Sequence, residues 1–214
     1  QVSLTKEEPN NILNYFYTLI AMACIYAAIF GNNEITNIQA NLSPLAARIN
    51  LAPIHKFKTF LASMSASFLI SFVEILILLA FTVFVLNVDY GSKTVLVIIT
   101  VLIGSIAGIS FGALISASVK KDENLKTGII IGVTMVGSFL SGMMYQDMKY
   151  IVAKNLPILS YINPVNLLTD ALYSLYYYDT LTRYFTNILG LILFILLSWF
   201  ITYLLIRRRK YASI

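Results

Sequence analysis

The sequence predicts an all-α, polytopic integral membrane protein. We expect five transmembrane helices, a cytoplasmic amphipathic helix and an external re-entrant helical hairpin. Hydrophobic residues make up 58% of the 214 residues and charged residues only 12%, about half the charged share of a soluble domain. The charges also leave long uncharged runs, and a helix of about 20 residues crosses a hydrocarbon core of about 30 Å. These runs are continuously apolar, whereas membrane strands alternate in short segments, so a β-barrel is a poor alternative.

The apolar runs divide one transmembrane domain, residues 1–214, into its predicted parts. The spans fall at residues 12–31, 59–88, 94–118, 127–145 and 184–206, and the second is interrupted only by Glu74. Gly31 and the two asparagines after it are typical of a helix end, so we expect the first span to stop there. The chain begins with Gln1 and has no signal segment, although five spans leave its amino terminus outside. We therefore expect a missing upstream portion with a further span.

The lysines and arginines predict the orientation, because they are enriched in cytoplasmic loops. With the carboxyl terminus inside, ten of the fifteen lie on the cytoplasmic side: Arg48, Lys56, Lys58, Lys120, Lys121, Lys126, Arg207, Arg208, Arg209 and Lys210. The other five lie outside: Lys6, Lys93, Lys149, Lys154 and Arg183. The charged turn at residues 120–126 is then a solvated cytoplasmic loop.

Residues 32–57 form an amphipathic element between the first two spans. Its apolar residues recur at steps of three and four, which is one stripe of a helix: Ile35, Ile38, Leu42, Leu45 and Ile49. Ser43 and Pro44 suit the start of a second short helix, and Pro53 ends it. The element is expected to lie along a surface rather than cross the membrane.

A polar stripe runs along the second span. Ser63, Ser67, Ser71 and Glu74 recur at helical spacing, and Glu74 stands near mid-membrane, where a charge is costly. Two interpretations remain open: Ser67, Ser71 and Glu74 line a substrate path, or the carboxyl is neutral and bonds a neighbouring helix.

Small residues predict which helices pack closely. Gly104, Gly108 and Gly112 recur every four residues in the third span, and Gly128 and Gly132 do so in the fourth. Such ladders let helices approach closely. We expect the two ladders to face each other in a tight hairpin.

Residues 146–183 are apolar enough to enter the membrane but too interrupted to cross it. Pro157, the Asn163-Pro164 pair and Asp170 break the run, which favours an external re-entrant hairpin. Its tyrosines suit an interfacial belt, with an aromatic substrate path as the alternative. They are Tyr161, Tyr173, Tyr176, Tyr177 and Tyr178.

The sequence offers no catalytic or metal-binding pattern. The lone His55 beside lysines is typical of a solvated residue, and Cys24 lies alone inside the first span. The sequence has no paired carboxylates on a common helix face, no histidine–cysteine cluster and no phosphate-binding loop. Neither catalysis by this chain nor a nucleic-acid partner is supported.

Three stretches resemble the permease subunits of ATP-binding-cassette (ABC) exporters of the type-two permease family. The first has Glu34, then Ser43-Pro44, Arg48 and Lys56, and is similar to the family's cytoplasmic segment after the second span. Residues 156–178 are similar to its external re-entrant pair. The third is the basic collar after the last span. The family has six spans, which agrees with the expected upstream portion.

The resemblance implies a coupling helix that docks into a separate ATPase subunit. The implied coupling residues are Glu34, Ile38, Leu42, Pro44 and Arg48. The chain would hold no cofactor, because ATP and Mg²⁺ would bind the ATPase partner. Further partners would be a second copy or a homologous permease, and membrane lipid. The implied location is the bacterial plasma membrane.

Three functions follow as hypotheses. The first is the membrane subunit of an ATP-driven exporter for an amphipathic substrate, such as a drug, an antimicrobial peptide or a lipid-like molecule. The second is a non-transporting scaffold or regulator that recruits a cytoplasmic partner through residues 32–57. The third is an intramembrane enzyme using Glu74, which lacks a second catalytic candidate.

Overall fold

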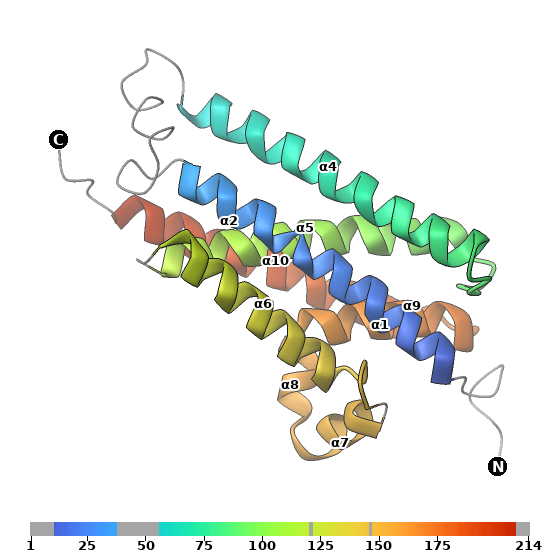
Figure 1. Ribbon diagram of the computed structural model, residues 1–214. Helices are drawn as coiled ribbons and strands as arrows, with labels where there is room; N and C mark the ends of the chain where they lie inside the picture. The colour runs from blue at the N-terminus through green and yellow to red at the C-terminus, as the bar shows by residue number, and fades with distance from the viewer. Residues whose placement is uncertain (1–10, 38–55, 120–121, 146, 209–214) are drawn as a thin grey trace.

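The computed structural model describes residues 11–37, 56–119, 122–145 and 147–208, which form an all-helical bundle (Figure 1). Its helices are α1 (Asn11–Tyr26), α2 (Ala28–Asn37), α4 (Lys56–Phe84), α5 (Thr94–Ser118), α6 (Glu123–Leu140), α7 (Asp147–Asn155), α8 (Pro157–Ile162), α9 (Pro164–Tyr177) and α10 (Thr182–Arg208). The starts of α1, α5 and α10 lie at one end of the bundle, which we call the α1 end. The end of α2 and the start of α4 lie at the other, the α2 end.

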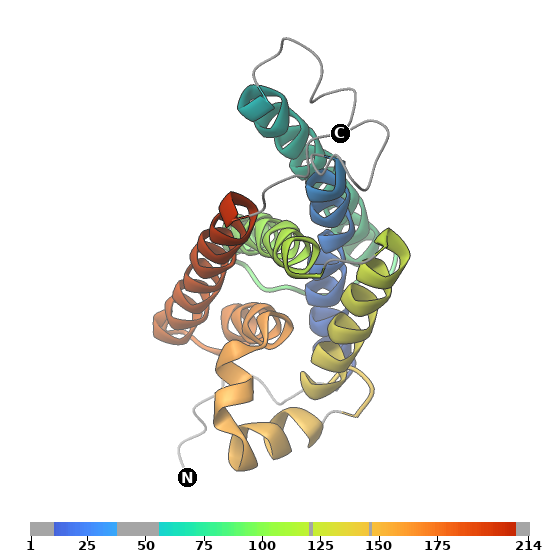
Figure 2. The ribbon, with the colours of Figure 1, turned by 90° about the vertical axis from the view of Figure 1, so that its left-hand side faces the viewer.

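Helix α5 is the centre of the bundle. It lies between α10 and the α1–α2 pair, with α4 outside them and α9 on the opposite side (Figure 2). Buried residues make up 61% of its most apolar stretch, against 28% for α4 and 22% for α10. The outer helices therefore present most of their apolar surface away from this chain, as lipid-facing helices do.

Four helical stretches of the described chain are long and apolar enough to cross a membrane. They are Ile12–Asn37, Ala62–Phe84, Thr94–Ser118 and Thr182–Ile206. Helix α6, the predicted fourth span, is not among them. Glu123 and Lys126 occupy its first turn, and the helix ends at Leu140, before Gly142 takes a positive φ of 94°. Residues 127–140 are shorter than the roughly 20 residues of a usual span, so a crossing here would include the turn after Leu140.

The first span does not end at Gly31, which corrects the prediction. After a break at Ala27 the chain continues helically as α2 to Asn37. A Cβ on Gly31 would lie 2.0 Å from the Ile109 carbonyl oxygen. The absence of a side chain at Gly31 therefore permits the close approach of α2 to α5. The start of the predicted amphipathic element is thus packed inside the bundle: Asn32, Ile35 and Thr36 are buried.

The glycine ladder of α5 packs against α1–α2 and not against α6. Cβ atoms on Gly108 and Gly112 would lie 2.3 Å from the Cys24 carbonyl oxygen and 1.8 Å from that of Ala28. At Gly128 and Gly132 of α6, by contrast, an added Cβ would meet no described atom within 4 Å. The expected pairing of the two ladders was therefore wrong.

Gly104 belongs to the same close contact. Its added Cβ would lie 2.9 Å from Leu168 of α9 and 3.0 Å from the Cβ of Cys24. The three α5 glycines thus let α1, α2 and α9 approach the central helix. Close packing of this kind replaces the hydrophobic driving force that lipid does not supply.

Helix α9 fills the interior at the α1 end. Eleven of its fourteen residues are buried. Asn163 caps it by accepting a hydrogen bond from the Val165 amide at 3.1 Å, and Pro164 takes the first helical position, as such helix starts favour. The Asn163-Pro164 step that interrupts the apolar run is therefore the start of a buried helix.

Candidate functional site

A carboxylate joins α2 to α4 at the α2 end. The Glu34 Oε1 atom accepts a hydrogen bond of 2.7 Å from the Ser67 hydroxyl, and its Oε2 atom accepts one from Ser63. Ser67 is buried, and α2 and α4 are the two helices that flank residues 38–55. Glu34 therefore ties together the helix that enters this segment and the helix that leaves it.

The rest of the predicted coupling set lies outside the described residues. Ile38, Leu42, Pro44 and Arg48 all fall between residues 38 and 55. Their contact with an ATPase stays a prediction, as does the amphipathic helix that carries them.

A second polar network joins α2, α5 and α6 at the same end. The Ser116 hydroxyl of α5 donates to the Asn32 carbonyl oxygen at 3.2 Å and lies 3.3 Å from the Thr36 hydroxyl. The Asn32 amide donates to the Thr127 hydroxyl at 3.3 Å, and the Lys126 amine donates to Ser116 at 3.2 Å. Lys126 is fully buried, so its placement in a solvated loop was wrong.

The residues of the predicted stripe of α4 differ in burial. Ser71 is buried and donates to the Phe68 carbonyl oxygen of its own helix at 3.0 Å, while Ser67 bonds Glu34. Glu74 instead has an exposed side chain that faces away from the described chain, on a helix that also exposes Val73 and Ile77. Within one copy of the protein the two serines are thus buried and the carboxyl is exposed, and a substrate path along them stays a prediction.

The strongest charge cluster of the described chain lies at the α1 end, around Asp170 of α9. Its Oδ1 atom accepts from the Lys149 amine at 2.8 Å and from Arg183 Nη2 at 2.7 Å. Its Oδ2 atom accepts from Arg183 Nε at 2.7 Å and from the Asn187 amide at 2.8 Å. Helix α9 thus presents one carboxylate to partners from α7 and α10.

The two cations decide the charge state of Asp170. Burial on its own would raise its pKa, but Lys149 and Arg183 outweigh burial and hold the pKa of this carboxyl well below its usual range. Asp170 is therefore an anion at neutral pH, and a buried carboxylate with four hydrogen bonds is well satisfied.

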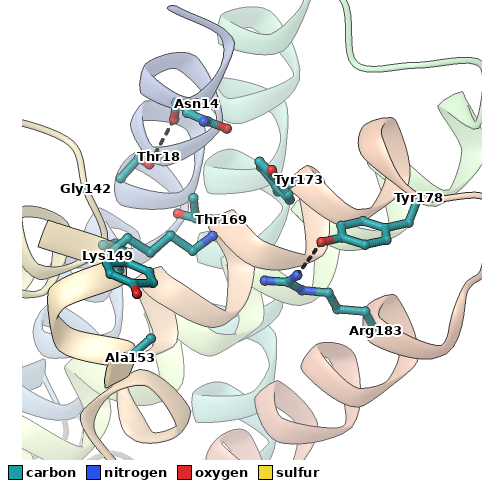
Figure 3. Close-up of a pocket in the computed structure, with 11 residues that line it drawn as sticks. Asn14, Thr18, Gly142, Lys149, Ala153, Thr169, Tyr173, Tyr178 and Arg183 are labelled. Carbon is teal, nitrogen blue, oxygen red and sulfur yellow. Dashed lines mark hydrogen bonds between the residues drawn. The ribbon is translucent and has the colours of Figure 1, made fainter. Parts of the chain in front are cut away.

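A cavity of about 310 Å³ adjoins this cluster (Figure 3). Lys149 and Arg183 extend toward each other across it, with the Tyr173 and Tyr178 rings beside them. The Lys149 amine lies 5.0 Å and the Arg183 Cζ atom 5.7 Å from the Tyr173 ring centroid, within cation–π range. Its walls come from α1, the end of α6, α7, α9 and the start of α10.

A cluster of ring contacts joins three tyrosines of α9. Tyr177 is fully buried and stacks on Tyr173 with ring centroids 4.3 Å apart, and Tyr176 meets Tyr177 edge-on at 4.8 Å. Tyr161 alone of the predicted set is strongly exposed, at 69%. Tyr177 is thus an interior residue, whereas the other four keep exposed surface, and an interfacial belt of these four stays a prediction.

Sequence reasoning treated Asp170 only as an interruption of an apolar run. A signal was available, because the same segment, residues 146–183, carries Lys149 and Arg183 on either side of Asp170. An ion pair within the segment would have explained all three charges, since intramembrane acids pair with cations.

Comparison with known proteins shows the family. The family model described as ABC-2 family transporter protein matches residues 1–204. No curated protein and no solved structure matches the chain. This match covers nearly the whole chain, and the four apolar helices agree with it. The chain therefore belongs to the ABC-2 transporter family and is a multi-pass membrane protein of the permease type, a generally non-catalytic class that implies an ABC ATPase partner.

Proposed function

We propose that the chain is the membrane subunit of an ATP-driven exporter that moves an amphipathic substrate out of a bacterial cell. A separate ABC ATPase supplies the energy, and a second copy or a homologous permease completes the transporter. The carboxyl terminus and the α2 end face the cytoplasm, and the α1 end faces outward.

The bond between Glu34 and Ser67 carries this proposal. A coupling segment moves substrate only if a push on it reaches the membrane helices. Residues 38–55 leave α2 and return in α4, and the Glu34 carboxylate locks these two helices together beside the segment. A push from the ATPase then shifts α2 and α4 as one rigid body instead of parting them.

The packing of α2 on α5 transmits the same movement further into the bundle. Helix α2 meets α5 at backbone distance at Gly31 and Gly112, and Ser116 bonds the Asn32 carbonyl oxygen. A movement of α2 therefore displaces the central helix with it. Proteins pass rigid-body shifts of this kind through packed interfaces.

Two features favour an arrangement with a fifth crossing and a re-entrant hairpin. Helix α6 runs beside α1–α2 for most of their length (Figure 1). The turn between α8 and α9 reaches the middle of the bundle: a cavity of about 250 Å³ there is lined by Asn163, Phe111 and Phe194, and Phe194 lies near the centre of α10. Asn163 donates to the Gly137 carbonyl oxygen of α6 at 2.7 Å, which satisfies polar groups at that depth.

The test is co-purification followed by coupled transport. The protein is extracted with mild detergent, the ABC ATPase that accompanies it is identified, and ATP-driven uptake of a fluorescent amphipathic dye is measured in inverted vesicles. We expect Ser67→Ala to lower the amount of dye moved per ATP hydrolysed. Ser110→Ala is the matched control, because among the described residues this buried hydroxyl donates to the Ile106 carbonyl oxygen of its own helix and joins no second helix.

Three outcomes decide between the hypotheses. Loss of coupling in Ser67→Ala alone supports the proposal. Equal coupling in both serine variants would refute the role of the Glu34 contact. Co-purification of a partner without any ATP-driven uptake would favour the scaffold or regulator that recruits its partner through residues 32–57.

A further inference from the structure

We propose that the cavity between α1, α7, α9 and α10 binds the phosphate headgroup of an anionic amphiphile, whose apolar chain lies in the adjoining groove. The site does not depend on the proposed transport activity. It rests on the charge of the cavity, on the hydrogen-bond donors left in it and on the groove that continues from it.

The cavity carries a surplus positive charge. Two cations, Lys149 and Arg183, share one carboxylate, that of Asp170. Among the described residues no second acid bonds either cation, so the three side chains together carry one positive charge. A phosphate group at this place would neutralise the surplus.

Hydrogen-bond donors remain for such a ligand. Arg183 directs three of its five N–H groups to described partners, two to Asp170 and one to the Tyr178 hydroxyl. Lys149 directs one of its three to Asp170. Phosphate oxygens accept from guanidinium and ammonium groups in short, charge-assisted bonds.

The cations are accessible, whereas their carboxylate is not. The side chains of Lys149 and Arg183 are 26% and 43% exposed, against 10% for Asp170. Asp170 therefore holds the cations from the protein side and leaves their outer faces to the cavity. The Tyr173 ring further fixes both of them through cation–π contact.

An apolar groove continues directly from the cavity. Asn14 and Tyr150 line both, and the groove, of about 1110 Å³, runs between the start of α1 and the chain that leaves α6. Its remaining walls are mostly apolar: Ile12, Tyr15, Phe16, Met143, Met144, Tyr145 and Asp147. A polar pocket that opens into an apolar groove fits a molecule with a charged head and an apolar tail, and a free phosphate would leave the groove unused.

The depth of the cavity fits the same ligand. The spans of α1 and α10 begin at Ile12 and Thr182, and the cavity lies beside these starts. This is the level of the membrane interface, where lipid headgroups lie and where long cationic side chains are stable. The ligand can therefore enter from the membrane with its tail still in the apolar region.

The test measures lipid binding to the purified full chain in detergent by native mass spectrometry. Phosphatidylglycerol is compared with phosphatidylcholine of the same acyl chains. We expect phosphatidylglycerol to bind at least about tenfold more tightly, and Lys149→Gln to remove about tenfold of this affinity, since hydrogen bonds to charged groups are of that size. Lys154→Gln is the matched control, because it removes the same charge from the exposed side of α7, outside the cavity.

A second pair of measurements separates the lipid from a soluble phosphate. We expect Met144→Ser, in the groove, to weaken the binding of phosphatidylglycerol. We also expect inorganic phosphate at millimolar concentration to compete poorly with this lipid. Strong competition by phosphate with no effect of Met144→Ser would overturn the amphiphile in favour of a soluble anion. Equal binding of the two lipids, or equal loss in Lys149→Gln and Lys154→Gln, would overturn the site itself.

Discussion

The glycines of α5 and α6 give a matched pair of substitutions with opposite expected effects. In Gly112→Ala the new Cβ would lie 1.8 Å from the Ala28 carbonyl oxygen, and ordinary contact begins at 3.4 Å. Helix α2 must then move by about 1.6 Å, the difference between these values, and the clashing atom is backbone that cannot rotate away. Gly108 and Gly31 are packed as tightly, so the whole interface has to open. We expect a loss of stability of about 3 kcal/mol, at the upper end of overpacking costs.

Gly132→Ala is the control for this substitution. It adds the same methyl group to a helix that also lies in the bundle, but the new Cβ meets no described atom within 4 Å. Alanine is a better helix former than glycine by up to about 1 kcal/mol, so this variant is expected to be neutral or more stable. The two variants should differ by about 4 kcal/mol.

The assay is thermal unfolding in one detergent, followed by size-exclusion chromatography of the heated samples. For a chain of this length a difference of about 4 kcal/mol corresponds to midpoints on the order of 10 °C apart. Equal midpoints would refute the packing of α2 on α5. A loss in Gly132→Ala as large as in Gly112→Ala would show that the exposed face of α6 is covered, either by α5 or by a second copy.

Three further substitutions test the charged and polar contacts. Glu34→Ala should lower the unfolding midpoint more than Ser67→Ala does, because it removes the acceptor of both Ser63 and Ser67. Equal midpoints would refute the Glu34 contact between α2 and α4. Asp170→Asn should lose about 2–3 kcal/mol of stability. The lowered pKa of Asp170 means that its contribution is full at neutral pH and is lost only as pH falls below the usual range of a carboxyl, so the wild-type advantage should be the same at pH 8 and pH 5.5. Glu74→Leu should leave the stability of a single copy unchanged or raise it, since its side chain is exposed; a marked loss would show that another copy or a polar path contacts it.

Apolar length was the most informative feature of the sequence. The uncharged run at residues 94–118 coincides with α5, Thr94–Ser118, because charged or polar residues bound it on both sides. The interrupted run after residue 146 was likewise expected not to cross, and it forms three short helices. Long periodic segments are determined locally, so they can be predicted from one sequence.

Contacts between helices could not be predicted in the same way. A ladder of small residues shows that some helix approaches, not which one: the pattern is the same in α5, where Gly108 meets Cys24, and in α6, where Gly128 meets no described atom. Gly31 was misjudged for a related reason. The Gly-Asn-Asn sequence is a local stop signal, but packing on α5 and the bonds of Asn32 keep the helix going.

Both ends of the bundle carry a carboxylate that joins helices, and the partners of the two carboxylates differ. At the α1 end, α9 fills the interior and Asp170 joins α7 to α10 through two cations. At the α2 end, Glu34 accepts from hydroxyl groups of α4, and the Lys126 amine bonds Ser116 of α5. We therefore infer that a push on residues 38–55 moves α2 and α4 together, whereas a ligand acts on the α1 end through the cations of its cavity.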